Sequence, residues 1–305
     1  MVVAQYLLTF REVLEAALLT AIILAFLVKT GRDRLVRYAW FGVYGATAAS
    51  LGLGAGIWLA YGTLSDENKV LFEGVAALIA VAVLTSMIYW MAVKGRTIKH
   101  EVENRVEAVV TQGAILGLAS VTFVLVFREG LETVLFLTPF LVADAVGTLI
   151  GAALGLAMGF ALALGVFRVG LKLDLRKFFY FTSLLLILLA GGLLGYGVHE
   201  LIDYAELRNV DLGWFGSAAY ALPIASDSLF HHKGVIGSIF AVMFGYTVSA
   251  EWGRLVAHLA YLALTLPLIV IVYRRPEWLR AASLRLRQLF RPPPAPPGAG
   301  TPQNE

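Results

Sequence analysis

The chain has 305 residues, of which 59% are hydrophobic and 15% charged, and its mean hydropathy is +0.78. It is far more apolar than a soluble domain, so we expect an integral membrane protein surrounded by lipid. The chain contains no cysteine, which excludes disulfides, thiolate-bound metals and iron–sulfur clusters, and leaves oxygen or imidazole as the ligands of any metal. The net charge is +3, but the basic residues lie mostly beside apolar segments, so we expect no nucleic-acid partner.

Several apolar segments are long enough to cross a hydrocarbon core of about 30 Å as helices. The predicted spans are residues 5–28, 38–60, 71–93, 113–141, 147–167, 179–201 and 255–273. Basic residues follow the first, third, fifth and seventh spans, whereas the opposite connections are acidic or poor in base. By the positive-inside rule, the sequence predicts an all-α integral membrane protein with seven transmembrane helices, its N-terminus outside and its C-terminus inside.

Three other stretches complete this description. Residues 234–250 are apolar but short, and an eighth crossing there would place the arginine-rich tail outside, so we expect a re-entrant or interfacial helix on the outer face. Residues 276–305 are basic and rich in proline and are predicted to form a cytoplasmic tail, in which the prolines after Arg291 exclude a helix. Gly151, Gly155 and Gly159 recur every four residues in the fifth span and predict close packing against another helix.

A charged motif occurs twice within these apolar spans. Arg11-Glu12-Val13-Leu14-Glu15 lies in the first span, and Arg128-Glu129-Gly130-Leu131-Glu132 lies in the fourth. Helices three spans apart cross in opposite directions, which is typical of an inverted repeat with a site between its halves. We therefore divide the chain into a first three-helix repeat (1–110), a second (111–202), an outer loop (203–254), a seventh helix (255–275) and the tail (276–305).

The three charges of each motif share one helix face, because positions i, i+1 and i+4 fall within an arc of roughly 100°. A charge near the bilayer centre costs at least about 2.5 kcal/mol, so these faces must meet one another or a wet cavity. One interpretation is structural only: Arg11 pairs with Glu15, and Arg128 with Glu132, as buried struts. It leaves Glu12 and Glu129 unpaired and the two motifs with a net charge of minus two, which favours a cation site.

The ligand atoms limit the class of cation but do not identify it. Four carboxylates suit a hard cation such as iron, manganese, magnesium or calcium, and oxygen ligands alone do not choose among them. Arg11 and Arg128 are the supporting charges, which keep the carboxylates ionised and prevent binding too tight for release.

Further acidic and imidazole groups are predicted at the outer side. Glu73 begins the third span and Glu200 ends the sixth, so they either form an ion entrance or are interfacial carboxylates solvated by water. The outer segments add further residues to this mouth, and for the adjacent pair of histidines a plain exposed loop is the favoured interpretation. These residues are His199, Asp203, Glu206, Asp227, His231 and His232.

The two Arg-Glu-x-x-Glu motifs, in the first and fourth of seven spans, resemble the high-affinity iron permease family. Phe72-Glu73-Gly74, His199-Glu200-Leu201 and Phe244-Gly245-Tyr246 are also similar to that family, so the resemblance covers residues 1 to about 273. It implies iron, ferric or ferrous, as the translocated substrate, and favours a functional role for Glu73. It implies the following ligands: Glu12, Glu15, Glu129 and Glu132. Fungal members work beside a ferroxidase, so a ferroxidase or periplasmic iron-delivery protein is an expected class of partner.

We therefore expect an iron permease of a bacterial cytoplasmic membrane that is not an enzyme and carries no prosthetic group. A transporter or exchanger of another divalent cation, such as manganese, is the alternative. An intramembrane metalloenzyme is disfavoured because no His-Glu-x-x-His motif occurs. A non-transporting assembly protein would leave Glu12 and Glu129 unexplained. The sequence leaves the oligomeric state open, with a homo-oligomer among the options.

Overall fold

A computed structural model describes residues 2–94, 97–111, 115–168, 175–225, 228–231 and 234–274. Asp227, His232 and the predicted tail lie outside the described residues. The α-helices are α1 (Val2–Lys29), α2 (Val36–Gly62), α3 (Asp66–Lys94), α4 (Ile98–Thr111), α5 (Ile115–Ala143), α6 (Ala145–Arg168), α7 (Leu175–Leu207), α8 (Val235–Phe244) and α9 (Trp252–Arg274). Two 3-10 turns (Asp33–Leu35, Gly213–Phe215) and two strands, β1 (Ala218–Ala221) and β2 (Ser249–Glu251), complete the described elements.

The predicted spans coincide with long helices. Among the described residues, five helical segments are long and apolar enough by composition to cross a membrane, namely Asp33–Gly62, Asp66–Val93, Ala145–Val166, Lys177–Leu207 and Trp252–Arg274. The chain is therefore a helical multi-pass membrane protein. Helices α1 and α5 have comparable lengths, 28 and 29 residues, but each carries the three charges of its motif.

Local polar groups fix where the long helices reverse. Asp66 and Glu67 occupy the first turn of α3, where carboxylates interact favourably with the helix dipole. Asp144 is the one residue between α5 and α6, and its Oδ1 accepts a hydrogen bond from the Gly147 N–H at 2.9 Å. These short connections make consecutive helices antiparallel.

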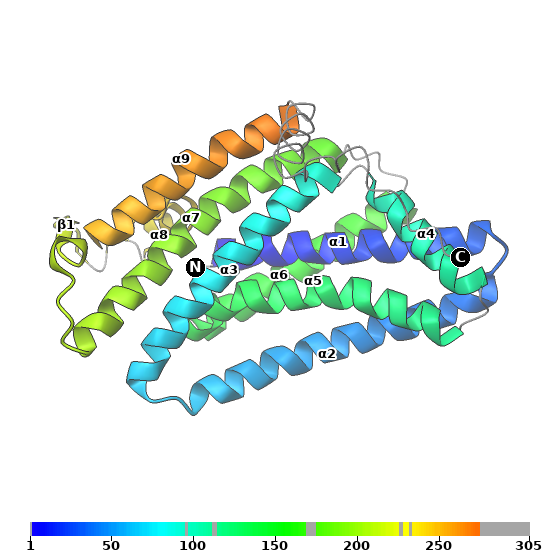
Figure 1. Ribbon diagram of the computed structural model, residues 1–305, viewed down its shortest axis with the longest axis horizontal. Coiled ribbons are helices and arrows are strands. Elements are labelled where there is room, and N and C mark those ends of the chain that lie inside the picture. The colour runs from blue at the N-terminus through cyan, green and yellow to red at the C-terminus, as the bar shows by residue number, and fades with distance from the viewer. Residues whose placement is uncertain are drawn as a thin grey trace, which may run out of the picture.

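The two motif helices lie side by side at the centre and run in opposite directions (Figure 1). Helix α6 packs along α1, α2 packs along α5, and α3 packs along α7, while α9 lies against α7. Exchanging α1 with α5, α2 with α6 and α3 with α7 leaves this set of pairs unchanged. The two sets of three helices therefore contribute alike to the bundle.

Glycines allow the closest of these contacts, as predicted for the fifth span. A Cβ atom added to Gly155 of α6 would lie 2.6 Å from the Tyr6 carbonyl oxygen of α1. Gly42 of α2 meets α5 in the same way, since an added Cβ would lie 2.5 Å from the Ala119 carbonyl oxygen. Neither α6 nor α2 could approach its neighbour this closely with a larger residue at these positions.

Helix α4 is an element that the sequence analysis treated only as a basic connection. Val102 and Val106 lie one turn apart and are buried against α1 and α5. Their neighbours are Leu19, Ile23, Leu27, Leu118 and Leu125. Helix α4 therefore covers the ends of both motif helices at the side where Lys29 lies.

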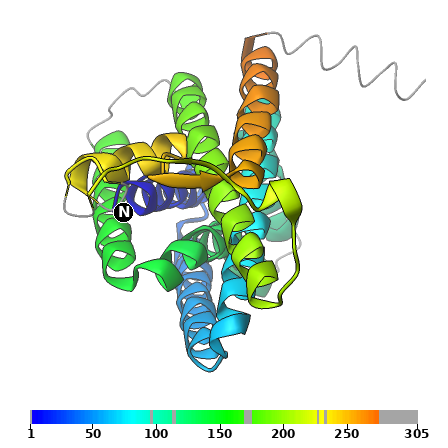
Figure 2. The same ribbon diagram turned by 90° about the vertical axis from the view of Figure 1, so that its left-hand side faces the viewer.

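The outer segment forms a helix that is shorter than the apolar stretch. Helix α8 ends at Gly245, whose φ of +64° suits glycine. The chain then continues into β2, which pairs antiparallel with β1. Figure 2 looks at this end of the molecule, where α8 and the strands lie across the helix ends. The strand pair was not predicted.

Candidate metal site

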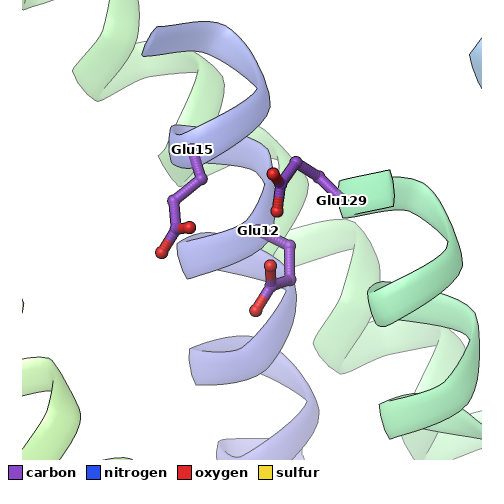
Figure 3. A group of neighbouring side chains, drawn as sticks. All are labelled: Glu12, Glu15 and Glu129. Atoms are coloured by element: carbon purple, nitrogen blue, oxygen red, sulfur yellow. The ribbon is translucent and has the colours of Figure 1, made fainter. Parts of the chain in front are cut away.

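The two motifs bring three carboxylates together at the centre of the bundle. Figure 3 shows Glu12 and Glu15 on α1 and Glu129 reaching toward α1 from α5. One oxygen of each lies within 4.8 Å of an oxygen of the other two, and all three side chains are buried. Two oxygens that bind one cation at about 2.3 Å lie at most about 4.6 Å apart, so this group needs little movement to hold a single hard cation.

Arg11 lies among these carboxylates and contacts both glutamates of its own motif. Its Nη1 is 2.8 Å from Glu12 Oε1, and its Nη2 is 2.7 Å from Glu15 Oε1. Nη1 also donates a hydrogen bond to Met87 Sδ of α3. The expectation that Arg11 pairs with Glu15 alone and leaves Glu12 unpaired is therefore wrong, because the guanidinium has several donors and reaches both neighbours.

Arg128 contacts its own motif differently. Its Nη2 is 2.7 Å from Glu129 Oε1, while its Nε is 3.5 Å from Glu132 Oε1. Its guanidinium carbon lies 4.7 Å from the centre of the Trp90 ring, in a cation–π contact. The closer partner is Glu129 rather than the predicted Glu132. Glu132 stands apart from the three-carboxylate group and borders a cavity of about 400 Å³ with Met87 and Trp90.

Each of the four motif glutamates nevertheless keeps one carboxylate oxygen that could bind a cation. No described residue makes a hydrogen bond to the second oxygen of the four glutamates, and these oxygens are buried. Two arginines against four carboxylates leave a net charge of minus two when all are ionised. Buried carboxylate oxygens without partners are costly, so the arrangement is the electrostatic complement of a cation.

A second carboxylate pair lies where α3 meets α7. The Tyr61 hydroxyl donates to Glu73 Oε1 at 2.6 Å, and the Tyr196 hydroxyl donates to Glu73 Oε2 at 2.5 Å. Tyr196 also interacts with Glu200, and Glu200 is close enough to Glu73 for electrostatic interaction. The structure therefore brings together the two carboxylates that the sequence placed at comparable depths, and it hydrogen-bonds both oxygens of Glu73.

Of the remaining residues predicted at the ion entrance, His199 and Asp203 lie beside Glu200, whereas Glu206 and His231 are not part of this cluster. His199 Nδ1 lies 3.2 Å from Glu251 Oε1 and 3.6 Å from Asp203 Oδ1, next to Glu200. Glu206 is exposed. His231 is buried rather than in a plain exposed loop, and Gly237 of α8 packs on its carbonyl group.

Sequence reasoning missed two charges beside this group. Glu251 ends β2, and Arg254 lies in the first turn of α9, where it interacts with Glu251, Glu200 and Asp203. A signal for them was present in the sequence, since both charges lie at the start of the last apolar segment. The strand pairing that carries Glu251 to His199 had no such signal.

Comparison with known proteins identifies the family. The sequence profile described as "Iron permease FTR1 family" matches residues 2–272. The chain belongs to this family. The match includes both Arg-Glu-x-x-Glu motifs and the long helices from α1 to α9, so the resemblance inferred from the motifs is confirmed.

Relatives within the iron permease FTR1 family align along most of the chain. An uncharacterized protein of Archaeoglobus fulgidus is 46% identical over 271 residues, covering 89% of this chain and 95% of its own. The ferrous iron permease EfeU of Yersinia pestis is 31% identical over 275 residues, covering 89% and 93%. The ferrous iron permease EfeU of Escherichia coli O6:H1 is 32% identical over 261 residues, covering 84% and 91%. No solved structure matches.

Proposed function

We propose that this protein is an iron permease that moves iron through the buried carboxylates of Glu12, Glu15 and Glu129, with Glu132 of the second motif adding negative charge beside them. The observation that carries the proposal is the meeting of the two motifs, which places three carboxylates within reach of one ion. The excess negative charge favours entry of a cation, and the neighbouring arginines weaken its binding so that it is released. Relatives named ferrous iron permease support iron as the substrate.

The membrane arrangement is part of the same proposal. Seven helices cross the cytoplasmic membrane as two inverted three-helix repeats plus α9, with the N-terminus outside and the C-terminus inside. The antiparallel motif helices and the exchange pattern of helix pairs support the repeats. The central position of α1 and α5 explains how they span despite three charges each, since neighbouring helices shield those charges from lipid.

The ion entrance lies at the outer ends of α3 and α7. Glu73 and Glu200 bind the ion there, and His199 with Asp203 attracts it from outside. The support is that these groups lie together at one end, and that two tyrosine hydroxyls hold Glu73 in place. A ferroxidase or periplasmic iron-delivery protein would supply the ion at this mouth, and the protein itself carries out no chemical conversion.

The test is uptake of radioactive iron into proteoliposomes. Glu129→Gln keeps the shape of the side chain but removes its charge, and should abolish uptake that the wild type shows. The control is Glu67→Gln, which makes the same change in a surface ion pair with Arg208 and should leave uptake unchanged.

Competition decides the identity of the ion. Uptake of iron that resists an excess of manganese, zinc and magnesium supports the permease. Glu129-dependent uptake that manganese competes more strongly than iron would instead favour the alternative, a transporter of another divalent cation, which the all-oxygen ligands also suit. Equal uptake by the Glu129→Gln variant would contradict the site.

A further inference from the structure

A cavity leads from the buried carboxylates to the end of α1 that carries Lys29. Its volume is about 540 Å³, and Glu15 and Glu129 line one end of it. It follows α1 from Glu15 to Lys29, a distance of about 21 Å at 1.5 Å per residue. Lys99 and Glu103 of α4 line the other end. The cavity thus joins the centre of the bundle to the side where the first and third spans end in basic residues.

The cavity is lined by charged residues at its two ends and by apolar residues between them. Apolar residues of α1, such as Leu18, Ile22 and Phe26, form the wall between the carboxylates and the mouth. At one end, Glu15 Oε2 is buried and no described residue hydrogen-bonds to it. The space is large enough for on the order of ten waters, so an ion that leaves Glu15 can move as a hydrated ion rather than from ligand to ligand.

Helix α4 positions a carboxylate where this path ends. The burial of Val102 and Val106 against α1 and α5 fixes the helix and turns Glu103 toward the cavity. Lys99 lies one turn earlier, and its Nζ is 4.0 Å from Glu103 Oε1, a loose contact that leaves the carboxylate available to another cation.

We propose that this cavity is the cytoplasmic exit path of the transported ion and that Glu103 binds the ion at its mouth. Lys29 and Lys99 repel a cation at the mouth, and Glu103 offsets part of that repulsion, so the ion can pass the mouth and is then released readily. The proposal rests on the proposed function, because it gives the route by which an ion held at Glu15 leaves.

Water access along the path can be tested separately from transport. The native chain has no cysteine, so single cysteines report on one position each. Ala21, the first position, lies in the cavity wall, eight residues before the end of α1. The control position is Val124, nine residues after the start of α5, whose side chain is 60% exposed on the outside of the bundle. The two variants are Ala21→Cys and Val124→Cys. A membrane-impermeant thiol reagent added to inside-out vesicles should modify the first and not the second, because a thiol in lipid forms little thiolate. An unreactive Ala21→Cys variant would overturn the path.

The role of Glu103 is tested by transport and binding together. In Glu103→Gln the initial rate of iron uptake should fall about tenfold, as expected for the loss of one charge at the mouth, while equilibrium iron binding to the central carboxylates stays at the wild-type level. The matched control is Glu107→Gln, one turn further along α4, where the side chain is exposed and does not line the cavity. Equal uptake rates in the two variants would overturn the role of Glu103.

The possible failures are distinguishable. If the wild type takes up no iron, the proposed function fails, and the exit path for iron fails with it, whatever the cysteine result. If uptake depends on Glu129 but Ala21→Cys is unreactive, the permease stands and the ion leaves by another route. If Ala21→Cys reacts but Glu103→Gln behaves like the control, the path stands without a ligand at its mouth.

Discussion

At the scale of single residues, the four motif glutamates do not hold equivalent positions. Glu12, Glu15 and Glu129 form the compact group, whereas Glu132 lies beside Arg128 and a separate cavity. We therefore expect Glu12→Gln, Glu15→Gln and Glu129→Gln to abolish iron uptake, and Glu132→Gln to reduce it only about tenfold, as for the loss of one indirect electrostatic contribution. Uptake by reconstituted variants measures this ranking. Complete loss in Glu132→Gln would place that carboxylate among the direct ligands.

Arg11 should matter for stability as well as for transport. It is 1% exposed and contacts two carboxylates, so Arg11→Gln leaves buried negative charges without a partner. Breaking a buried ion pair in this way should lower the free energy of unfolding by about 3–5 kcal/mol. Arg208→Gln is the control. The Arg208 side chain is 60% exposed, and its ion pair with Glu67 should contribute about 1 kcal/mol or less to the free energy of unfolding. Thermal unfolding in detergent compares them, and equal losses of stability would mean that Arg11 is not a buried counter-charge.

The sequence was sufficient to predict that the two motif faces meet, but not which atoms pair. Helical spacing places Arg11 on the same face as Glu12 and Glu15, and the cost of charge in lipid forces that face inward. Both glutamates are within reach of the guanidinium, so the choice depends on side-chain rotamers and on Met87 of α3, as the choice for Arg128 depends on Trp90 of α3. Those neighbours come from another part of the chain and leave no trace in the motif.

At the scale of helices, hydropathy located the long elements because lipid requires continuous apolar stretches. Helix α4 was missed because most of its residues are charged or polar, and a single row of apolar residues, Ile98, Val102, Val106 and Val110, marks its buried face. The strand pair was missed because β1 and β2 are three or four residues long and are separated by α8. Such short pairings depend on where α9 and α7 bring the chain, not on local pattern.

The contact between α6 and α1 gives a prediction at this scale. Gly155→Ala puts a methyl group against the backbone of α1, so it should lower the free energy of unfolding by about 1–3 kcal/mol. Gly52→Ala is the matched control, because nothing lies within 4 Å of an added Cβ there and alanine favours the helix by up to about 1 kcal/mol. Thermal unfolding of both variants in detergent tests this. A destabilised Gly52→Ala variant would show that α2 contacts a further surface.

At the scale of the whole molecule, transport direction depends on which ends of the helices face outward. The proposed entrance at Glu73 and Glu200 and the proposed exit at Glu103 lie at opposite ends of the bundle, so reversing the protein in the membrane would exchange them. By the positive-inside rule, the basic residues that follow α1 and α3 predict that the Glu103 end faces the cytoplasm. The apolar pattern locates the membrane spans but does not orient them, so the orientation is predicted from the charges in the connections alone.

The cysteine-free chain allows this orientation to be measured directly. Ser65→Cys lies in the exposed connection between α2 and α3, and Thr30→Cys lies in the exposed connection between α1 and α2. An impermeant maleimide added to intact cells should modify Ser65→Cys and spare Thr30→Cys, which becomes reactive once the membrane is opened. The two positions are separated by a single crossing, so they must report opposite sides if α2 spans. The reverse labelling pattern would show the opposite orientation in the membrane, with the Glu103 cavity opening to the outside. Labelling of both variants in intact cells would contradict a crossing by α2.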